Sequence, residues 1–378
     1  MTPRALRGWS WVHKWTSLVA TLFMLILCVT GLPLVFYEEI DHLAGSKIEA
    51  PAMPAGTPRA SLDAVVAAAV AAFPGKVPLY VFAEKEDPGL WLVKLDTRVD
   101  TDERNAVFAA IDARTARWLG QPVFNDGVMN VFYRLHVDLF AAEAGRLFLG
   151  AMGLLLVISI VSGTVLYAPF MRRLLFGTVR HDRSPQLRWL DLHNLLGIGT
   201  LVWALAVAAT GVVNTGAGLL LSHWQRTEVA ERLAAYRGQP PVPEDQRAPL
   251  QAVLAAAQAQ APGRRLAFAA FPGTAYSSPY HVTCYLNGDD PLASRLPRPV
   301  LVDARTAAVT ASLELPWYLK VALLARPLHV AGDGALPLKL LWALLDMATI
   351  VVLGSGLYLW LGRRTGLPQE PAPRGRSG

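Results

Sequence analysis

Residues 7–31 read RGWSWVHKWTSLVATLFMLILCVTG, and they place one histidine, His13, among three tryptophans at the start of a long apolar run. A helix needs about 20 apolar residues to cross a bilayer, and this run is long enough. Three later stretches have the same length and character. The sequence therefore predicts four membrane helices, at residues 15–37, 147–171, 195–213 and 340–362.

The overall composition also favours a membrane protein. Of the 378 residues, 53% are hydrophobic and 17% are charged, which is too apolar for an ordinary soluble enzyme. The first helix is expected to stay as an uncleaved anchor, because its apolar run is longer than a signal-peptide core and no small-x-small site directly follows it. The two cysteines, Cys28 and Cys284, lack metal-site spacing, and we expect no disulfide between them.

Basic residues gather in three regions: before the first helix, between the second and third helices, and after the fourth. These regions hold twelve Lys and Arg against three acids. Cytoplasmic loops carry such an excess, so both termini and the short loop are predicted to lie in the cytoplasm. The two long segments then lie outside the membrane, and the first of them, residues 38–145, has ten basic and sixteen acidic residues. The net charge of +6 thus reflects membrane orientation, and no nucleic acid partner is expected.

The first and third predicted helices share a pattern, as internal repeats do. His13 is followed eighteen residues later by Gly31, in VTG, and His193 is followed eighteen residues later by Gly211, in ATG.

The second and fourth predicted helices share another pattern. His136, in YRLHVDLF, precedes Ser162 and Gly163 by 26 and 27 residues, and His329, in RPLHVAGD, precedes Ser355 and Gly356 by the same distances. The long segments match as well: LDAVVAAAVAAFPGK (62–76) with LQAVLAAAQAQAPGR (250–264), and IDARTA (111–116) with VDARTA (302–307).

The chain is therefore predicted to be two parallel copies of a helix–domain–helix unit, which pack about a pseudo-two-fold axis along the membrane normal. Each outer segment starts with an alanine-rich helix and continues with alternating, strand-like runs. The fold class is a membrane protein of four transmembrane α-helices with two small α+β domains outside the membrane. The expected parts are the N-terminus and first helix (1–37), first domain (38–145), second helix (146–171), cytoplasmic loop (172–190), third helix (191–213), second domain (214–337), fourth helix (338–362) and cytoplasmic tail (363–378).

Four of the eight histidines follow the repeat. The two-fold axis brings His13 and His193 together at the cytoplasmic end and His136 and His329 together at the outer end. Two opposed imidazoles in a helix bundle are typical axial ligands of a haem iron, whereas zinc takes three or four protein ligands. The sequence thus indicates two b-type haems, each with one pair as iron ligands. In the alternative reading, the histidines contact lipid headgroups or were merely duplicated as structural residues.

The remaining polar residues of interest have plainer explanations. No site is assigned to His42, His181, His223 or His281. Trp9, Trp11, Trp15 and Trp360 fit an interfacial aromatic belt. A carboxyl inside a membrane helix is unfavourable, and Asp346 has Gly153 as its counterpart in the other copy. Four interpretations stay open for Asp346: it is protonated, it relays protons, it faces the bundle axis, or it makes a polar packing contact with a Thr or Ser of a neighbouring helix.

The duplicated H…TG and LH…SG…Y patterns, with DARTG-like outer modules, resemble the PepSY-associated transmembrane helix family over about residues 8–362. That family includes inner-membrane ferric-siderophore reductases of Gram-negative bacteria, among them ferrioxamine reductases. The resemblance implies PepSY-like periplasmic domains on a haem-bearing four-helix core, and reduction of Fe(III) in a hydroxamate siderophore to Fe(II). It also implies that the four repeated histidines are the haem ligands.

Three functions therefore remain open. The first is a transmembrane ferric-siderophore reductase, the second a non-enzymatic module that binds or regulates a periplasmic partner, and the third a cytochrome subunit that donates electrons to a periplasmic protein. No G-x-G-x-x-G follows a predicted strand, so no flavin or nicotinamide module is expected. Electrons would come from a separate donor, either a quinol or a cytoplasmic reductase.

Overall fold

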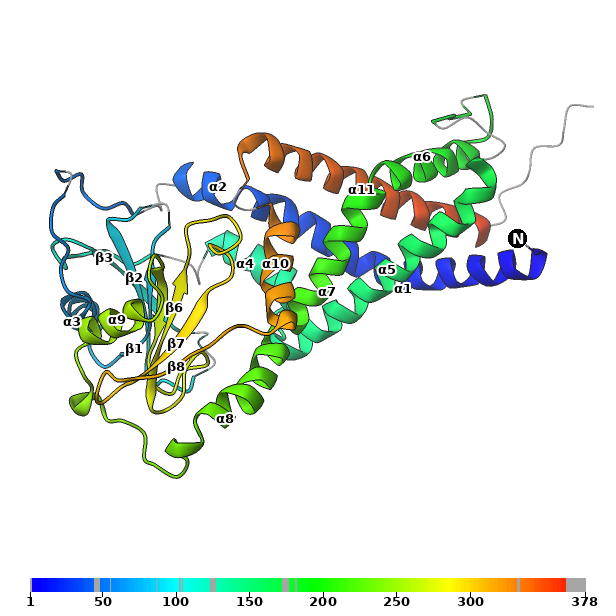
Figure 1. The fold of residues 1–378 in the computed structure, drawn as a ribbon. Helices are drawn as coiled ribbons and strands as arrows, with labels where there is room; N and C mark the ends of the chain where they lie inside the picture. The colour runs from blue at the N-terminus through cyan, green and yellow to red at the C-terminus, as the bar shows by residue number, and fades with distance from the viewer. Residues whose placement is uncertain are drawn as a thin grey trace, which may run out of the picture. The chain divides into compact units, whose positions relative to one another are not determined.

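A computed structural model describes residues 2–43, 48–54, 56–85, 87–101, 103, 105–122, 127–171, 177–180, 182–331 and 334–364 (Figure 1). The chain forms two compact units. The helical unit comprises Met1–Phe36, Phe132–Gly216 and Ala325–Gly378, and the sheet unit comprises Tyr37–Val131 and Ala217–Leu324. Each unit thus combines segments from both halves of the chain.

Long apolar helices make up most of the helical unit. Its helices are α1 (Pro3–Val35), α4 (Gly127–Val137), α5 (Ala142–Met171), α6 (Pro185–Gly199), α7 (Leu201–Trp224), α10 (Trp317–Val330) and α11 (Leu336–Arg364), of which α4, α7 and α10 continue into the sheet unit. Within the described residues, four helices are long and apolar enough to cross a membrane: Pro3–Val35, Ala142–Pro169, Leu201–Arg232 and Leu336–Gly362. The chain is a multi-pass membrane protein.

The third predicted membrane helix differs from the expected residues 195–213. The structure divides that stretch at Thr200, between α6 and α7. Gly197 and Gly199 precede the break, and glycine weakens a helix interior. The matching positions in α1 are Ser17 and Val19, and α1 is continuous. Beyond Trp224 the helix continues through a π-helical turn, η1 (Gln225–Val229), and α8 (Ala230–Arg232).

The sheet unit contains one eight-stranded antiparallel sheet, with α3 (Leu62–Ala72) and α9 (Leu250–Ala259) on one face (Figure 1). Each half of the chain supplies a helix followed by four strands. The strands are β1 (Val77–Ala83), β2 (Leu90–Asp96), β3 (Val107–Asp112), β4 (Trp118–Gly120), β5 (Arg265–Ala270), β6 (His281–Asn287), β7 (Arg298–Asp303) and β8 (Val309–Ser312). Short helices α2 (Tyr37–Leu43), η2 (Ala234–Tyr236) and η3 (Glu244–Gln246) complete the unit.

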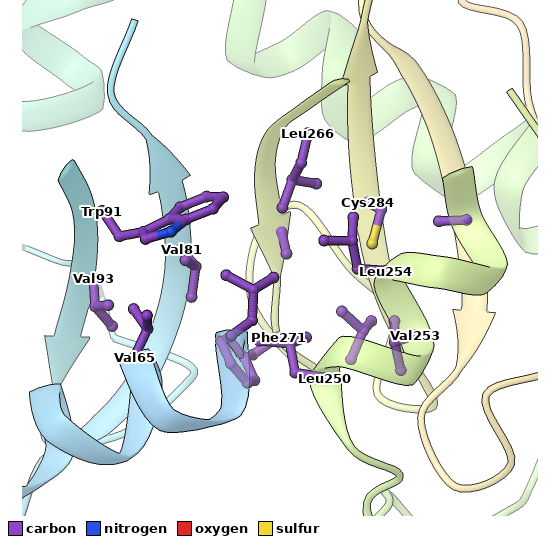
Figure 2. Close-up of a cluster of buried hydrophobic side chains, with 14 of the residues drawn as sticks. Val65, Val81, Trp91, Val93, Leu250, Val253, Leu254, Leu266, Phe271 and Cys284 are labelled. Carbon is purple, nitrogen blue, oxygen red and sulfur yellow. The ribbon is translucent and has the colours of Figure 1, made fainter. Parts of the chain in front are cut away.

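The two outer segments are joined, rather than forming the two separate domains expected from the sequence. Strand β1 pairs with β5, with Val81 opposite Ala269, so the sheet continues from one half to the other. One apolar core underlies both halves, including Val65 and Trp91 from the first and Val253 and Cys284 from the second (Figure 2). Four strands and one helix bury little apolar area alone, so the shared core stabilises both halves.

The first turns of α3 and α9 exchange hydrogen bonds. The Asp63 carboxylate on α3 accepts from the backbone N–H groups of Leu250 (2.6 Å) and Gln251 (3.0 Å). In return, the Gln251 side-chain oxygen accepts from the backbone N–H of Leu62 at 3.1 Å. These groups satisfy helix-terminal N–H donors that lack partners within their own helix. The exchange ties the two halves together beside the shared core.

Replacing Asp63 with alanine is expected to lower the free energy of unfolding of the sheet unit by about 1–2 kcal/mol, because two backbone donors of α9 lose their acceptor. Denaturant unfolding of the detergent-solubilised chain would measure the change. Alanine at the exposed Asp245 is the control and should leave the unfolding midpoint unchanged. An equal midpoint for both variants would contradict the capping role.

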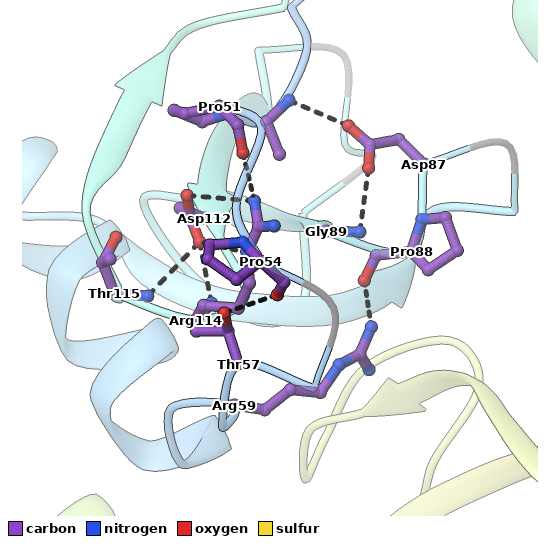
Figure 3. A network of polar contacts seen from close by, with 11 residues as sticks. Pro51, Pro54, Thr57, Arg59, Asp87, Pro88, Gly89, Asp112, Arg114 and Thr115 are labelled. Atoms are coloured by element: carbon purple, nitrogen blue, oxygen red, sulfur yellow. Dashed lines mark hydrogen bonds and ion pairs between the residues drawn. The ribbon is translucent and has the colours of Figure 1, made fainter.

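The repeated DARTA motifs form turns at the ends of β3 and β7. In the first copy, the Asp112 carboxylate accepts from the backbone N–H groups of Arg114 (2.8 Å) and Thr115 (3.3 Å), and Arg114 also donates to the Pro51 carbonyl (Figure 3). Asp303 accepts in the same way from Arg305 and Thr306. Burial raises the pKa of Asp112, but the hydrogen bonds from Arg114 and Thr115 outweigh it and hold this pKa below its usual value. These motifs stabilise the fold.

Candidate functional site

The four repeated histidines lie in the helical unit as two close pairs. His13, on α1, and His193, on α6, have ring centroids 6.5 Å apart at an interplanar angle of 72°. His136, on α4, and His329, on α10, have centroids 6.1 Å apart at 60°. Each ring is half-buried. The structure therefore brings together the two combinations that the repeat suggested.

Each imidazole is fixed by a backbone carbonyl of a neighbouring membrane helix. The carbonyl contacts the Nδ1 atom in all four cases. The distances are 2.9 Å for Ser159 to His13, 3.0 Å for Leu27 to His136, 3.0 Å for Val352 to His193 and 2.9 Å for Val207 to His329. A carbonyl oxygen only accepts, so Nδ1 must be the protonated nitrogen of each ring. The lone pair of Nε2 is then left for a ligand.

A hydroxyl three residues after each carbonyl completes this contact. Ser162, Thr30, Ser355 and Thr210 lie 3.3, 3.2, 3.1 and 3.4 Å from the Nδ1 atoms of His13, His136, His193 and His329. Each hydroxyl donates to a carbonyl of its own helix, as Thr30 does to Ile26 at 2.7 Å. The hydroxyl oxygen is therefore an acceptor toward the imidazole.

A glycine immediately after each hydroxyl makes room for the ring. A Cβ atom on Gly163 would lie 2.9 Å from Cε1 of His13, closer than such atoms approach in real proteins. The corresponding distances are 3.2 Å for Gly31 and His136, 3.1 Å for Gly211 and His329, and 3.3 Å for Gly356 and His193. The glycines of the TG and SG motifs thus lie directly against the four histidine rings. We call each set of carbonyl, hydroxyl and glycine a histidine clamp.

The two pairs lie well apart along the bundle. Helix α1 carries His13 and also supplies the Leu27 carbonyl that holds His136. Fourteen residues of α-helix span about 21 Å at 1.5 Å per residue. One pair therefore lies near each end of the membrane-spanning part of the unit.

The spacing within each pair suits one metal ion between two imidazoles. A ring nitrogen binds a transition metal at about 2 Å, and the ring centroid lies roughly 1 Å behind that nitrogen, so two imidazoles that share one metal ion would have centroids roughly 6 Å apart. A carbonyl on the opposite ring nitrogen is the usual orienting partner of a metal-binding histidine. Among the residues that the structure describes, no group of three or more His, Cys, Asp or Glu is placed to hold a metal. The two-ligand sites thus fit a haem, whose porphyrin supplies four nitrogens, better than zinc.

The other histidines are not part of either pair. His281 is fully buried in β6, where its ring nitrogens contact the hydroxyls of Ser278 (2.7 Å) and Thr310 (2.8 Å). His223 packs against Tyr318, and His42 lies in α2. His181 lies outside the described residues. None of the three described residues opposes a second histidine.

Asp346 is buried in α11 and lies beside the Cys28 thiol of α1. A thiol is thus one of its neighbours, which was not considered from the sequence. Two tryptophans near Asp346, Trp203 and Trp342, escaped the sequence reasoning. Trp203 is the third residue of α7 and Trp342 the seventh residue of α11, so their places in the sequence gave no signal that set them apart from other membrane tryptophans.

The comparisons with known proteins agree with the architecture. A protein of Pseudomonas aeruginosa, described as uncharacterized protein PA4219, is 28% identical over 260 residues, which cover 64% of this chain and 65% of that protein. The match thus spans less than two thirds of the relative's length. The sequence model of a protein family, described as the PepSY-associated TM region, matches residues 10–363, which is nearly the whole chain. The chain therefore belongs to the PepSY-associated TM family.

Proposed function

We propose that the protein is a two-haem membrane reductase that moves electrons across the inner membrane to Fe(III) bound by a periplasmic hydroxamate siderophore. The two histidine pairs, each with Nε2 free and a ring spacing suited to one iron, are the observation that supports it. His13 and His193 would hold the haem at the cytoplasmic end. His136 and His329 would hold the haem at the outer end.

The chain's own groups would set the position and the electronic character of the iron ligands. Each carbonyl keeps Nδ1 protonated and orients the ring, which also raises the basicity of Nε2. Each glycine allows the ring to approach the opposing helix. A bis-imidazole haem supplies a one-electron couple when it is bound. The described residues of the sheet unit form an antiparallel sheet and contain no G-x-G-x-x-G nucleotide motif. We therefore infer that the reducing electrons come from a separate donor.

The siderophore assignment follows from the family resemblance and from the charge pattern that predicts a periplasmic sheet unit. Hydroxamate oxygens hold Fe(III) tightly and Fe(II) poorly, so one electron would release the iron. The four matched clamps, two on each pair, favour a redox role over a module in which the histidines are only structural.

The absorption spectrum of the purified chain tests the haem part of the proposal. A Soret band, with sharp α and β bands after reduction, and about two haems per chain are expected. Mixing the reduced protein with a ferric hydroxamate siderophore should then reoxidise it and form Fe(II), measured with a ferrous chelator. A protein without haem would support the non-enzymatic module. A haem protein that is inert toward the siderophore would support the cytochrome subunit.

Glycine substitutions test the clamp. Alanine at Gly163 is expected to displace the His13 ring and lower the haem content at the cytoplasmic pair, because the new Cβ would lie 2.9 Å from the ring. Alanine at Gly354 is the control, since nothing lies within 4 Å of its Cβ position. Alanine favours a helix over glycine by about 1 kcal/mol, so loss of helix stability would not explain haem loss. Equal haem content in the two variants would contradict the clamp.

Membrane orientation is a separate prediction. The excess of basic residues at the termini and the short loop predicts that both are cytoplasmic. Reporter fusions after Gly120 and after Gly288 should therefore both report a periplasmic location. A cytoplasmic signal from either fusion would contradict both the orientation and the parallel arrangement of the two copies.

A further inference from the structure

A chain of hydrogen bonds in the second half of the sheet unit ends at a serine. The Asp303 carboxylate lies 2.9 Å from the Tyr236 hydroxyl, which lies 3.1 Å from the Thr310 hydroxyl. The Thr310 oxygen lies 2.8 Å from Nε2 of His281, and Nδ1 of the same ring lies 2.7 Å from the Ser278 hydroxyl. His281 is fully buried in β6, and Ser278 is half-buried in the turn before this strand. One imidazole thus connects a carboxylate network to a serine hydroxyl.

The carboxylate fixes the direction of each hydrogen bond in this chain. Burial raises the pKa of Asp303, but the hydrogen bonds that its carboxylate accepts outweigh burial and hold this pKa below its usual value, so the group is ionised and only accepts. Tyr236 therefore donates to Asp303, and Thr310 donates its single hydrogen to the Tyr236 oxygen. The Thr310 oxygen then accepts from Nε2–H of His281, which leaves Nδ1 with a lone pair that accepts from Ser278.

A serine that donates to a neutral imidazole has the arrangement of a nucleophile with a general base. Burial lowers the pKa of His281 to about 4, while the charge of Asp303 acts in the opposite direction, so the ring is neutral at pH 7 and can accept a proton. The backbone N–H of Tyr280 donates to the Ser278 oxygen at 3.2 Å, which holds this oxygen in place beside the ring.

The fold itself does not require this chain of hydrogen bonds. Leu90 of the first copy corresponds to His281 at an offset of 191 residues, the offset that aligns the two DARTA motifs. By the same offset, Leu119 corresponds to Thr310. Leu90 and Leu119 pack in one apolar cluster with Ile48. The same strands are therefore stable with apolar side chains at these positions, and the second copy has hydrogen-bonded polar groups there instead.

Ser278 lies in the wall of a cavity of about 310 Å³ within the sheet unit. Trp224, Tyr285 and Leu301 also line this cavity and are almost fully buried, so its inner wall is largely apolar and aromatic. Another part of the wall is the π-helical turn η1, and such turns are rare and occur frequently at functional sites. Small-molecule pockets begin at about 300 Å³, so the cavity has room for a small, mainly apolar molecule beside the Ser278 hydroxyl.

We propose that Ser278 and His281 hydrolyse small carboxylic esters. The Ser278 oxygen attacks the carbonyl carbon while its proton passes to Nδ1 of His281, and the bond from that carbon to the alcohol oxygen breaks as the alcohol takes this proton. Water then attacks the acyl-serine in the same way, which releases the acid and restores the serine. An imidazole of low pKa is a weak base, so an ester is a better substrate than an amide, which has a poorer leaving group.

Thr310, Tyr236 and Asp303 are positioning residues, because they act on the imidazole and not on the substrate. They keep the proton of His281 on Nε2 and so keep the lone pair of Nδ1 directed at the serine. This site lies in the sheet unit and uses none of the four paired histidines, so it goes beyond the proposed haem function.

Labelling of the full chain in detergent with a fluorophosphonate tests the nucleophile. The Ser278 oxygen is expected to displace fluoride, and mass spectrometry of peptides locates the phosphonyl group. Ser278→Ala should abolish labelling at this position and lower the rate of p-nitrophenyl acetate hydrolysis about a hundredfold. Ser277→Ala is the matched control, because Ser277 lines the same cavity but donates to the His281 carbonyl. This variant should keep both the label on Ser278 and the hydrolysis.

His281→Leu separates catalysis from folding, because leucine stands at the corresponding position of the first copy. It should remain folded and lower the labelling rate about a hundredfold. Thr310→Val should lower that rate about tenfold, and Thr310→Ser, which keeps the hydroxyl, should restore it. A probe that labels no serine, or a serine other than Ser278, would overturn the proposal, as would an unaltered labelling rate in His281→Leu. If His281→Leu unfolds, equal labelling rates in the two Thr310 variants would overturn it.

Discussion

Alanine at His13 is expected to remove one haem, and alanine at His193 is expected to remove the same one. The ring centroids of these residues lie 6.5 Å apart, so each variant would leave the proposed haem iron with one protein ligand. The haem-to-protein ratio should fall from about two toward one, and the two variants should lose the same spectral component. The double variant should look like either single variant, because ligands that act as a unit are not additive.

Alanine at His136 or His329 is expected to remove the other haem and to leave the first one in place. The four spectra should therefore fall into two identical pairs. Alanine at His223 is the control, because this residue packs against Tyr318 and opposes no second histidine. Retention of both haems in the His13 variant would contradict the cytoplasmic-end assignment. If every alanine variant lost both haems because the chain unfolded, methionine variants at the same positions would separate unfolding from the loss of a ligand. Methionine can also bind haem iron.

The pairing of histidines in the helical unit could be predicted because the two halves of the sequence share a spacing. A histidine stands at the same offset from a glycine in each half, and this pattern predicted which residues far apart in the chain lie close together. The physical role of that glycine was not predictable from spacing. It depends on which helix lies opposite: Gly163 of α5 receives His13, whereas Gly31 of α1 receives His136. The packing of the helices decides which glycine lies opposite which histidine, and the residues around each glycine do not reveal that packing.

Two features of the structure escaped the sequence for different reasons. The pairing of β1 with β5 joins strands almost two hundred residues apart, and nothing in either strand distinguishes an edge from an interior position. Two modules of alternating runs therefore looked like two domains. The break at Thr200 could have been predicted from the sequence, since two glycines precede it. The high apolar content of residues 195–213 outweighed that signal.

The unpaired indoles of Trp203 and Trp342 illustrate a third limit. A tryptophan in a membrane helix usually packs as an apolar side chain, and only the structure shows that both N–H groups are buried with no acceptor among the described residues.

The second prediction with a large expected effect concerns the direction of electron flow. Ferric siderophores are too large and polar to pass through a helix bundle, so reduction should occur beside His136 and His329, on the predicted periplasmic side. The His136→Ala chain is therefore expected to lose siderophore reduction almost completely, by about a hundredfold or more, while absorption of the remaining haem still responds to the physiological donor.

The His13→Ala chain provides the complementary measurement. It should lose turnover driven by the donor, but after chemical reduction it should still transfer an electron to the ferric siderophore in a single turnover. The two variants then separate entry from exit, because each retains one half-reaction that the other lacks. Stopped-flow absorption at the Soret band follows both half-reactions in the same samples. If the His136→Ala chain reduced siderophore at the unaltered rate, the outer pair would not be the exit, and the path through two haems would be wrong.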